Sequence, residues 1–176
     1  PQDKAVVKGV LPNGMSYYLV SNKASLGQAD FALVQKTGTG NCIDTSCTYP
    51  LDPTDIARSA LTSLPRIRNA SPQTFAIRQG AIPSEDGFVS VSPDATTFRF
   101  NDVQVGRGQA VTDSTLLLLM DMVDRVSTSS DSCIRKWYVP EDQAVIVSGD
   151  IDVQAVAGKL KMLSYMTAAY PSSDRK

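Results

Sequence analysis

The chain has 176 residues, of which 42% are apolar and 20% charged, and its 17 basic and 18 acidic side chains leave a formal charge of -1 with no histidine. A chain of this length fits one domain around one hydrophobic core. The balanced charge and the lack of runs of Lys or Arg argue against nucleic acid as a partner. Without imidazole, the common serine and cysteine triads and the usual catalytic zinc site are excluded within this chain.

The N-terminal part of the chain predicts strands. Val6 to Val10 and Met15 to Val20 read as two short strands, joined by a turn in which Asn13-Gly14 supplies the positive φ angles of a tight hairpin. Phe31 to Lys36 is a third predicted strand. The segment from Gly38 to Pro50 is rich in Gly, Thr, Asn and Ser, and it is predicted to be a loop.

Two helices are predicted next. Asp52-Pro53 is a favourable N-cap and first-turn pair for a helix that Pro65 ends. Apolar residues follow this start at helical spacing on one face: Ile56, Ala57, Ala60, Leu61 and Leu64. Ser71-Pro72 opens a second helix in the same way, and Gly80 ends it.

A β-hairpin is predicted between Gly87 and Val103, where the apolar pattern changes to period two. It consists of a strand from Phe88 to Val91, a Pro93-Asp94 turn and a strand from Thr96 to Phe100. The adjacent acids Glu85-Asp86 before it are interpreted as a solvated turn.

The longest predicted helix is capped by Thr112-Asp113 and is followed by a buried strand from Ala144 to Val147 and a last helix from Val153 to Leu163. Asp121, Asp124 and Arg125 are expected to face water. The apolar stripe of the long helix consists of Leu116, Leu117, Met120, Val123 and Val126.

The predicted order of elements is β-β-β-α-α-β-β-α-α-β-α. This order predicts an α+β sandwich, in which helices pack on an antiparallel sheet. No repeat, low-complexity tract or linker divides the chain, so residues 1–176 are expected to form a single domain. The longest apolar run, Leu116 to Met120, is far shorter than the roughly 20 residues that a membrane-spanning helix needs.

The three cysteines do not form a zinc-binding pattern, because a CxxC spacing and a fourth ligand are both missing. Cys42 and Cys47 flank a short loop, while Cys133 stands apart in the sequence. Two readings remain open at this stage. Cys42 and Cys47 form a disulfide in an exported protein, or the thiols are reduced and buried.

Asp150 and Asp152 stand between a predicted strand and a predicted helix. Two carboxylates at such a place can hold a metal or act as an acid/base pair. The simpler interpretation is an N-cap that satisfies the first N–H groups of the helix. The aromatic pair Trp137-Tyr138 either lines a groove or packs in the core. The residues alone therefore define no catalytic constellation.

Two stretches of the sequence resemble one peptidase family. The run from Leu11 to Val20 (LPNGMSYYLV) looks like the first hairpin of the pitrilysin/insulinase zinc peptidases. Trp137-Tyr138-Val139-Pro140, followed by a strand and Gly149-Asp150-Ile151-Asp152, is similar to a second signature of this family. Gly80-Ala81 and the strand from Thr96 to Val103 resemble the segment that follows its metal-binding helix. The resemblance implies a LuxS/MPP-like metallohydrolase fold, here in the form of a truncated single domain.

The residues that carry out catalysis in this family are not present in this sequence. Active members of the family carry His-x-x-Glu-His on the first helix, where the histidines bind zinc and the Glu activates a water molecule. By register, these three positions are Arg58, Leu61 and Thr62. The third ligand, a Glu on a later helical segment, is missing with its segment before Trp137. The resemblance therefore implies a degenerate member without catalytic residues, metal ligands or cofactor.

A protein without this chemistry is expected to act as a scaffold or protein-binding module. The expected partner is an active peptidase homologue or a second similar domain, on this or another chain. The alternative is that the strand Phe88, Val89, Ser90 and Val91, where the family carries an Asn-Ala pair at Phe88 and Val89, binds extended peptides by strand addition. A third hypothesis is a histidine-free hydrolase using Asp150 or Asp152. The family link and the start at Pro1 suggest export, to the periplasm or outside the cell.

Overall fold

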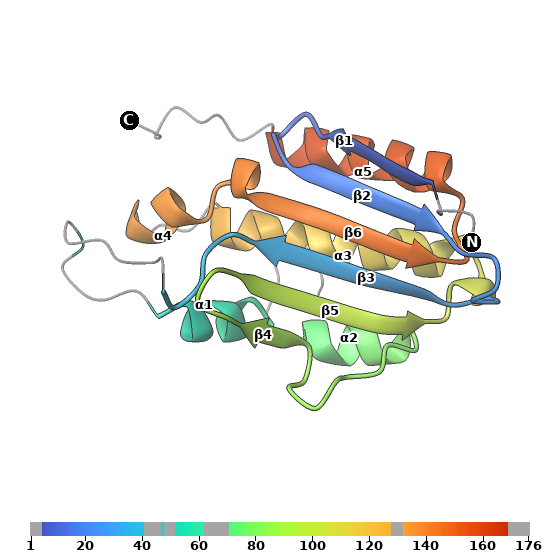
Figure 1. The fold of residues 1–176 in the computed structure, drawn as a ribbon, viewed down its shortest axis with the longest axis horizontal. Coiled ribbons are helices and arrows are strands. Elements are labelled where there is room, and N and C mark those ends of the chain that lie inside the picture. The colour runs from blue at the N-terminus through green and yellow to red at the C-terminus, as the bar shows by residue number, and fades with distance from the viewer. Residues whose placement is uncertain (1–4, 41–46, 48–51, 62–70, 128–131, 169–176) are drawn as a thin grey trace.

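One mixed sheet organises the structure. The computed structural model describes residues 5–40, 47, 52–61, 71–127 and 132–168. Six strands lie in the order β1-β2-β6-β3-β5-β4 (Figure 1). Their bounds are β1 (Val6–Val10), β2 (Ser16–Ser21), β3 (Ala29–Gln35), β4 (Val89–Val91), β5 (Thr96–Val103) and β6 (Gln143–Gly149).

The helices gather on one side of this sheet. In Figure 1, α1, α2, α3 and α5 lie behind the strands, and α4 lies at the left-hand end. Their bounds are α1 (Pro53–Ala60), α2 (Pro72–Arg78), α3 (Gln109–Ser127), α4 (Ser132–Trp137) and α5 (Val153–Ala168). Two short 3-10 turns cover Val105–Arg107 and Pro140–Asp142. The predicted α+β class and the predicted order of helices and strands are confirmed.

The sequence predicted an antiparallel sheet, but the observed sheet is mixed. β2 and β6 run parallel, while the other four pairs of described strands are antiparallel. The reason lies in the connection through residues 22–28, which makes β2 and β3 run in opposite directions. Since β6 lies between them, it must be parallel to one of the two. Strand order, which local patterns do not reveal, thus decides direction.

The hydrophobic core lies between the sheet and the helices. Every second side chain of the central strands points to this side, as the period of a strand requires. Full burial of one large apolar side chain contributes about 1.5–3 kcal/mol. The largest fully buried side chains include Leu19, Phe31, Phe100, Leu116, Met120 and Leu160.

Local capping signals behave as predicted at three helix starts. The Asp52 carboxylate accepts from the N–H of Thr54 at 2.8 Å, and Ser71 caps α2 through Thr74. Asp152 caps α5. The predicted end of the first helix at Leu64 and Pro65 lies outside the described residues, and α1 is observed to Ala60.

The first hairpin differs from its prediction in one residue. Gly14 has a positive φ of 92°, but Asn13 does not. The N–H of Leu11 donates to the carbonyl of Met15, and the N–H of Gly14 donates to that of Leu11. This is a longer loop with a single left-handed glycine, whereas the two-residue type I′ turn that Asn-Gly favours would need two positive φ angles. The side chain of Asn13 instead accepts a hydrogen bond from the N–H of Met15.

The long helix α3 corrects two further predictions. It begins at Gln109, so Thr112 and Asp113 lie inside it and do not form its cap. Asp121 and Asp124 do not face water: the side chain of Asp121 is fully buried, and that of Asp124 is buried as well. Figure 1 shows the physical reason, because α3 lies behind the central strands with α5 on one side and α1 and α2 on the other. A helix covered on several sides has no solvated stripe.

The disulfide does not join Cys42 to Cys47, the candidate pair that the sequence had left open beside reduced thiols. Cys47 is bonded to Cys133, and their Cα atoms are 6.1 Å apart. This bond ties the segment after β3 to α4 across a sequence separation of 86 residues. Cys42 lies outside the described residues. Cys133, which stands apart in the sequence, is therefore one half of the disulfide.

Candidate functional site

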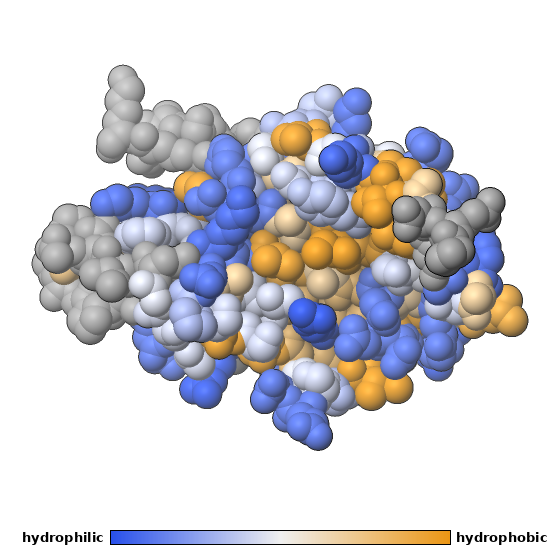
Figure 2. Space-filling view, in the orientation of Figure 1, coloured by the Kyte–Doolittle hydropathy of each residue, from blue (hydrophilic) through white to orange (hydrophobic). Residues whose placement is uncertain are grey.

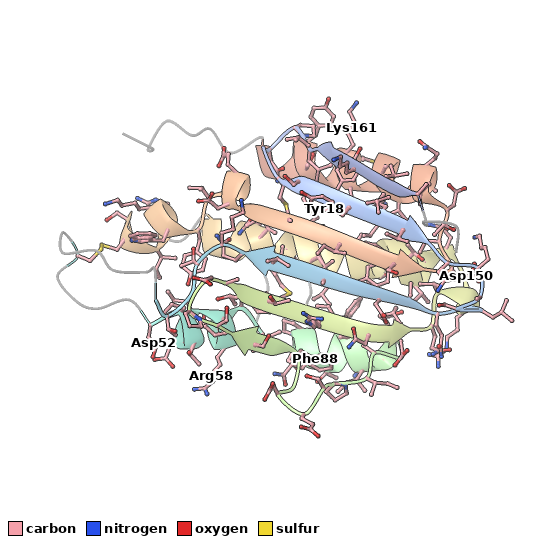
Figure 3. All side chains as sticks on the ribbon, viewed as in Figure 1. Tyr18, Asp52, Arg58, Phe88, Asp150 and Lys161 are labelled. Carbon is pink, nitrogen blue, oxygen red and sulfur yellow. A yellow bond between two sulfur atoms is a disulfide. The ribbon has the colours of Figure 1, made fainter. Side chains whose placement is uncertain are left out.

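The helix that would carry a zinc motif is α1, and its side chains do not suit that role. The Arg58 side chain is 71% exposed, and its Nη1 lies 3.8 Å from Oδ1 of Asp55. Figure 3 shows Arg58 pointing away from the sheet. Leu61 is buried in the core. Thr62 lies outside the described residues.

Neither described position can bind or activate a zinc-bound water. A guanidinium stays protonated and offers no lone pair to a cation, and Leu61 has no proton-accepting atom. In the ranges that the structure describes, no group of three or more His, Cys, Asp and Glu side chains is placed to hold a metal ion. The described residues at these positions do not fit the zinc ion that the resemblance implies, and no reaction step through a metal follows.

Asp150 is held in a structural role at the end of β6. Its Oδ2 accepts from the N–H of Gly27 at 2.9 Å, and its Oδ1 lies 3.1 Å from Nζ of Lys23. The Gly27 N–H, and after it the Lys23 ammonium, lower the pKa of Asp150 below the usual 3.8. A carboxylate held ionised by two donors is a poor general acid or base near neutral pH.

The bonds of Asp150 predict a pH-dependent contribution to stability. Because the folded-state pKa is lowered, the contribution is present above pH 3.8 and is lost as the pH falls through the folded-state value. We expect Asp150→Asn to be less stable than the wild type at neutral pH, and the difference to disappear in acid. Thermal unfolding measured across this pH range checks the expectation. A stability difference between the wild type and Asp150→Asn that stays the same at every pH would contradict it.

Asp152 and the cavity beside it offer no substrate site either. Oδ1 of Asp152 accepts from the N–H groups of Gln154 and Ala155 at 3.0 and 3.1 Å, which confirms the N-cap interpretation. A cavity of about 80 Å³ lies against Asp150, Asp152 and the start of α5. Ligand pockets typically enclose about 300–1,000 Å³. The histidine-free hydrolase hypothesis thus finds no support at these carboxylates.

The four residues predicted to contact a peptide fall into two groups. Phe88 precedes β4, and its ring is buried against Phe100 with the ring centroids 5.3 Å apart. Val89 and Val91 are half-buried against the core, and only Ser90 exposes its side chain. The side chain of Phe88 is therefore part of the core, which corrects its predicted place in a binding strand.

β4 is nevertheless an edge strand. The N–H of Arg99 donates to the carbonyl of Phe88, and the N–H of Ser92 donates to that of Ala95. By the alternation of an antiparallel pair, the backbone groups of Val89 and Val91 point away from β5. Thr39 donates to the carbonyl of Ser92, so the accessible edge is short.

The aromatic pair of the second signature is used for packing. Tyr138 is buried in the core, and Trp137 is half-buried. The backbone carbonyl of Trp137 accepts from Oγ1 of Thr37 at 2.9 Å. Of the two readings of this pair, the core reading is the one observed. None of the helices in the described ranges has the length and apolarity to cross a membrane.

One accessible feature of the sheet was not predictable from local sequence patterns. One face is covered by helices, and no described helix covers the other (Figure 1). We call the apolar centre of this second side the open sheet face. Hydrophobic side chains gather there, over β2, β6 and β3 (Figure 2). The open sheet face consists of Tyr18, Val20, Ala32, Val34, Ala144 and Ile146.

Strand order explains why this face was missed. The alternation of side chains along each strand indicates two faces of the sheet. The continuous apolar sequence of β6, however, is typical of a strand buried on both faces. Ile146 is 37% exposed, although it lies in a continuous apolar run. Only when β6 is known to lie between β2 and β3 do these side chains form one surface.

Solved structures of known proteins share this fold. Neither models of protein families nor characterised protein sequences match the chain. Pitrilysin superposes with a TM-score of 0.70 at 13% identity, over 99% of this chain and 24% of its own. The first half of the periplasmic protease PqqL from Escherichia coli superposes with a TM-score of 0.69 at 15% identity, over 92% of this chain and 46% of its own.

An inactive domain of a peptidase M16 protein from Pseudomonas fluorescens has the same fold. It superposes with a TM-score of 0.60 at 9% identity, over 92% of this chain and 50% of its own. The fold is therefore that of a domain of the pitrilysin/insulinase peptidases, which confirms the resemblance at the level of the fold. The chain spans about half, or a quarter, of the length of these structures.

Proposed function

We propose that this chain is an inactive peptidase-like domain that lacks the zinc site and acts as a scaffold or protein-binding module. The observation that carries the proposal is the type and burial of the side chains at the end of α1. By the register of the sequence resemblance, the exposed Arg58 and the buried Leu61 correspond to the positions of a zinc ligand and of the base. The absence of histidine from the whole sequence removes the imidazole ligands of that site.

The proposed partner is a second domain of the same fold or an active peptidase homologue. Structures with this fold that match nearly all of the chain extend well beyond it, by a factor of about two or four. The sheet side that no described helix covers offers a surface for such a partner. Residues 1–176 would then be a single domain that completes a larger assembly.

Export to the periplasm or the cell exterior is part of the proposal. The Cys47–Cys133 disulfide supports it, because such bonds persist in oxidising compartments and are rare in a reducing cytosol. The PqqL protease that shares the fold is described as periplasmic.

Zinc content and peptidase activity test the inactive assignment. We expect far less than one zinc per chain after incubation with zinc and desalting, and no cleavage of fluorogenic peptides. Pitrilysin assayed in parallel shows that the conditions suit this fold. The zinc measurement needs no knowledge of the substrate. Retained equimolar zinc, or cleavage that a chelator stops, would contradict the proposal.

The alternative function is binding of extended peptides at β4 without cleavage. It is favoured by the outward backbone groups of Val89 and Val91 on the sheet edge. The short accessible edge, which ends where Thr39 bonds to Ser92, limits the number of main-chain bonds. Fluorescence anisotropy with the same peptides decides this point, since peptides that stay intact and free argue against it.

A further inference from the structure

The short helix α4 lies at one end of the sheet, outside the group of helices behind the strands (Figure 1). Cys133, near its start, is bonded to Cys47 in the segment after β3. No residue of α4 is buried, although Ile134 and Trp137 pack partly against the core. A helix of 6 residues is not stable by itself, so α4 depends on its contacts for its position.

The contacts at the end of α4 are polar. The carbonyl of Trp137 accepts from Oγ1 of Thr37 at 2.9 Å and from Nε2 of Gln35 at 3.4 Å. Gln35 and Thr37 are almost fully buried. Gln143 lies directly opposite Gln35 in the pairing of β3 with β6, and it is buried as well. The end of α4 therefore lies against a polar part of the molecular interior.

Three buried polar atoms of these residues have no hydrogen-bond partner among the described protein groups. They are Oε1 of Gln35, Oε1 of Gln143 and Nε1 of Trp137. A polar atom that loses water without gaining a protein partner opposes its own burial. The noncovalent contacts of α4 are therefore weak for their number, and we expect the disulfide to keep the helix in place.

The elements next to α4 are anchored independently of it. Tyr138, directly after α4, is buried in the core. Strand β6, which begins at Gln143, pairs with both β2 and β3. Leu116 and Met120 of α3 are fully buried. The chain can thus move between Trp137 and Tyr138 while the sheet and α3 keep their packing.

The disulfide is accessible to a reductant, since Cys47 and Cys133 are both partly exposed. Thiol–disulfide exchange begins when a thiolate attacks one sulfur of such a bond. A dithiol supplies this thiolate, and its second thiol then resolves the mixed disulfide. Two electrons and two protons pass to Cys47 and Cys133, which become thiols, while the dithiol becomes a disulfide.

We propose that the Cys47–Cys133 disulfide is a redox switch for the position of α4. In the oxidised chain α4 is held at the end of the sheet. Reduction by a dithiol releases Ser132–Trp137, while the sheet and α3 stay folded. The switch goes beyond the proposed scaffold function and does not depend on it, because it requires neither a partner nor the loss of the zinc site.

Fluorescence tests the switch directly, because Trp137 is the single tryptophan of the chain. The oxidised chain is compared with the chain treated with dithiothreitol, both without denaturant. We expect reduction to shift the emission of Trp137 to longer wavelength and to raise its quenching by acrylamide about twofold, since a half-buried ring becomes exposed. Reoxidation should restore both signals.

Amide hydrogen exchange shows whether the release is local. After reduction, exchange in residues 132–137 should become at least about tenfold faster, while the amides of β3 and β6 stay protected. Cys133→Ser should show the released state with and without the dithiol. Cys42→Ser is the matched control, and it should respond to the dithiol as the wild type does.

Three results would overturn the switch. The first is unchanged quenching and exchange of residues 132–137 after reduction. The second is loss of protection in β3 and β6 as well, which would mean that the disulfide holds the whole domain together. The third is a Cys42→Ser variant that no longer responds. None of these outcomes involves zinc binding or peptide cleavage, so they are distinct from failure of the proposed function.

Discussion

Replacement of Cys133 by Ser should lower the free energy of unfolding by about 4 kcal/mol. The Cys47–Cys133 bond closes a long loop, with 86 residues of separation, and cross-links over such loops restrict the unfolded chain strongly. Urea unfolding of oxidised protein, with and without a reductant, measures the change. The reductant should destabilise the wild type by a similar amount and leave Cys133→Ser unchanged.

Cys42→Ser is the control that separates the two disulfide assignments. With Cys47 bonded to Cys133, this variant should keep the stability of the oxidised wild type and its sensitivity to reductant. Peptide mapping without reduction should then recover one cross-linked species containing Cys47 and Cys133. If Cys42→Ser costs as much as Cys133→Ser, the observed pair is wrong.

Phe88→Asn should destabilise the domain by at least about 3 kcal/mol. The sequence resemblance aligns Phe88 with a position at which the family carries an Asn, but the Phe88 ring is buried against Phe100. Truncating a buried Phe costs about 3–5 kcal/mol, and an unpaired buried amide adds to the loss. Chemical unfolding monitored by circular dichroism checks this expectation.

Ser90→Asn is the matched control for Phe88→Asn. Ser90 lies on β4 with its side chain exposed, so the same amide should change stability by less than about 0.5 kcal/mol. A mild effect of Phe88→Asn, comparable with that of Ser90→Asn, would mean that Phe88 does not anchor the hairpin. The core assignment of Phe88 would then fail.

Features that depend on neighbouring residues were predictable from the sequence. The caps at Asp52, Ser71 and Asp152 are confirmed, because an N-cap depends on N–H groups two or three residues away. The hairpin of β4 and β5 follows from period-two alternation and a turn. The order of helices and strands follows from the same local signals.

Features that depend on distant parts of the chain were not predictable in this way. The burial of Asp121 depends on helices and a sheet packed around α3, and the Cys47–Cys133 pairing depends on where α4 lies. The parallel pairing of β2 with β6 depends on strand order. In each case the deciding partner is many residues away, so no short window of sequence contains it.

The same distinction between local and distant partners holds for the candidate site. The positions Arg58 and Leu61 came from the family register, and in the structure Arg58 lies on α1 and Leu61 is the C-cap of that helix. The side-chain types at these positions were sufficient to argue against a metal. The open sheet face could not be found, since the side chains of β2, β6 and β3 form one surface only when the strand order is known.

The position of β6 has a consequence for how the chain folds. This strand is encoded last but lies between β2 and β3, which are encoded first. During synthesis the β1–β2 hairpin and the β3–β5–β4 unit can each form, but they cannot join before residues 143–149 leave the ribosome. Until then each unit presents an unpaired strand edge, which is the kind of surface that chaperones cover.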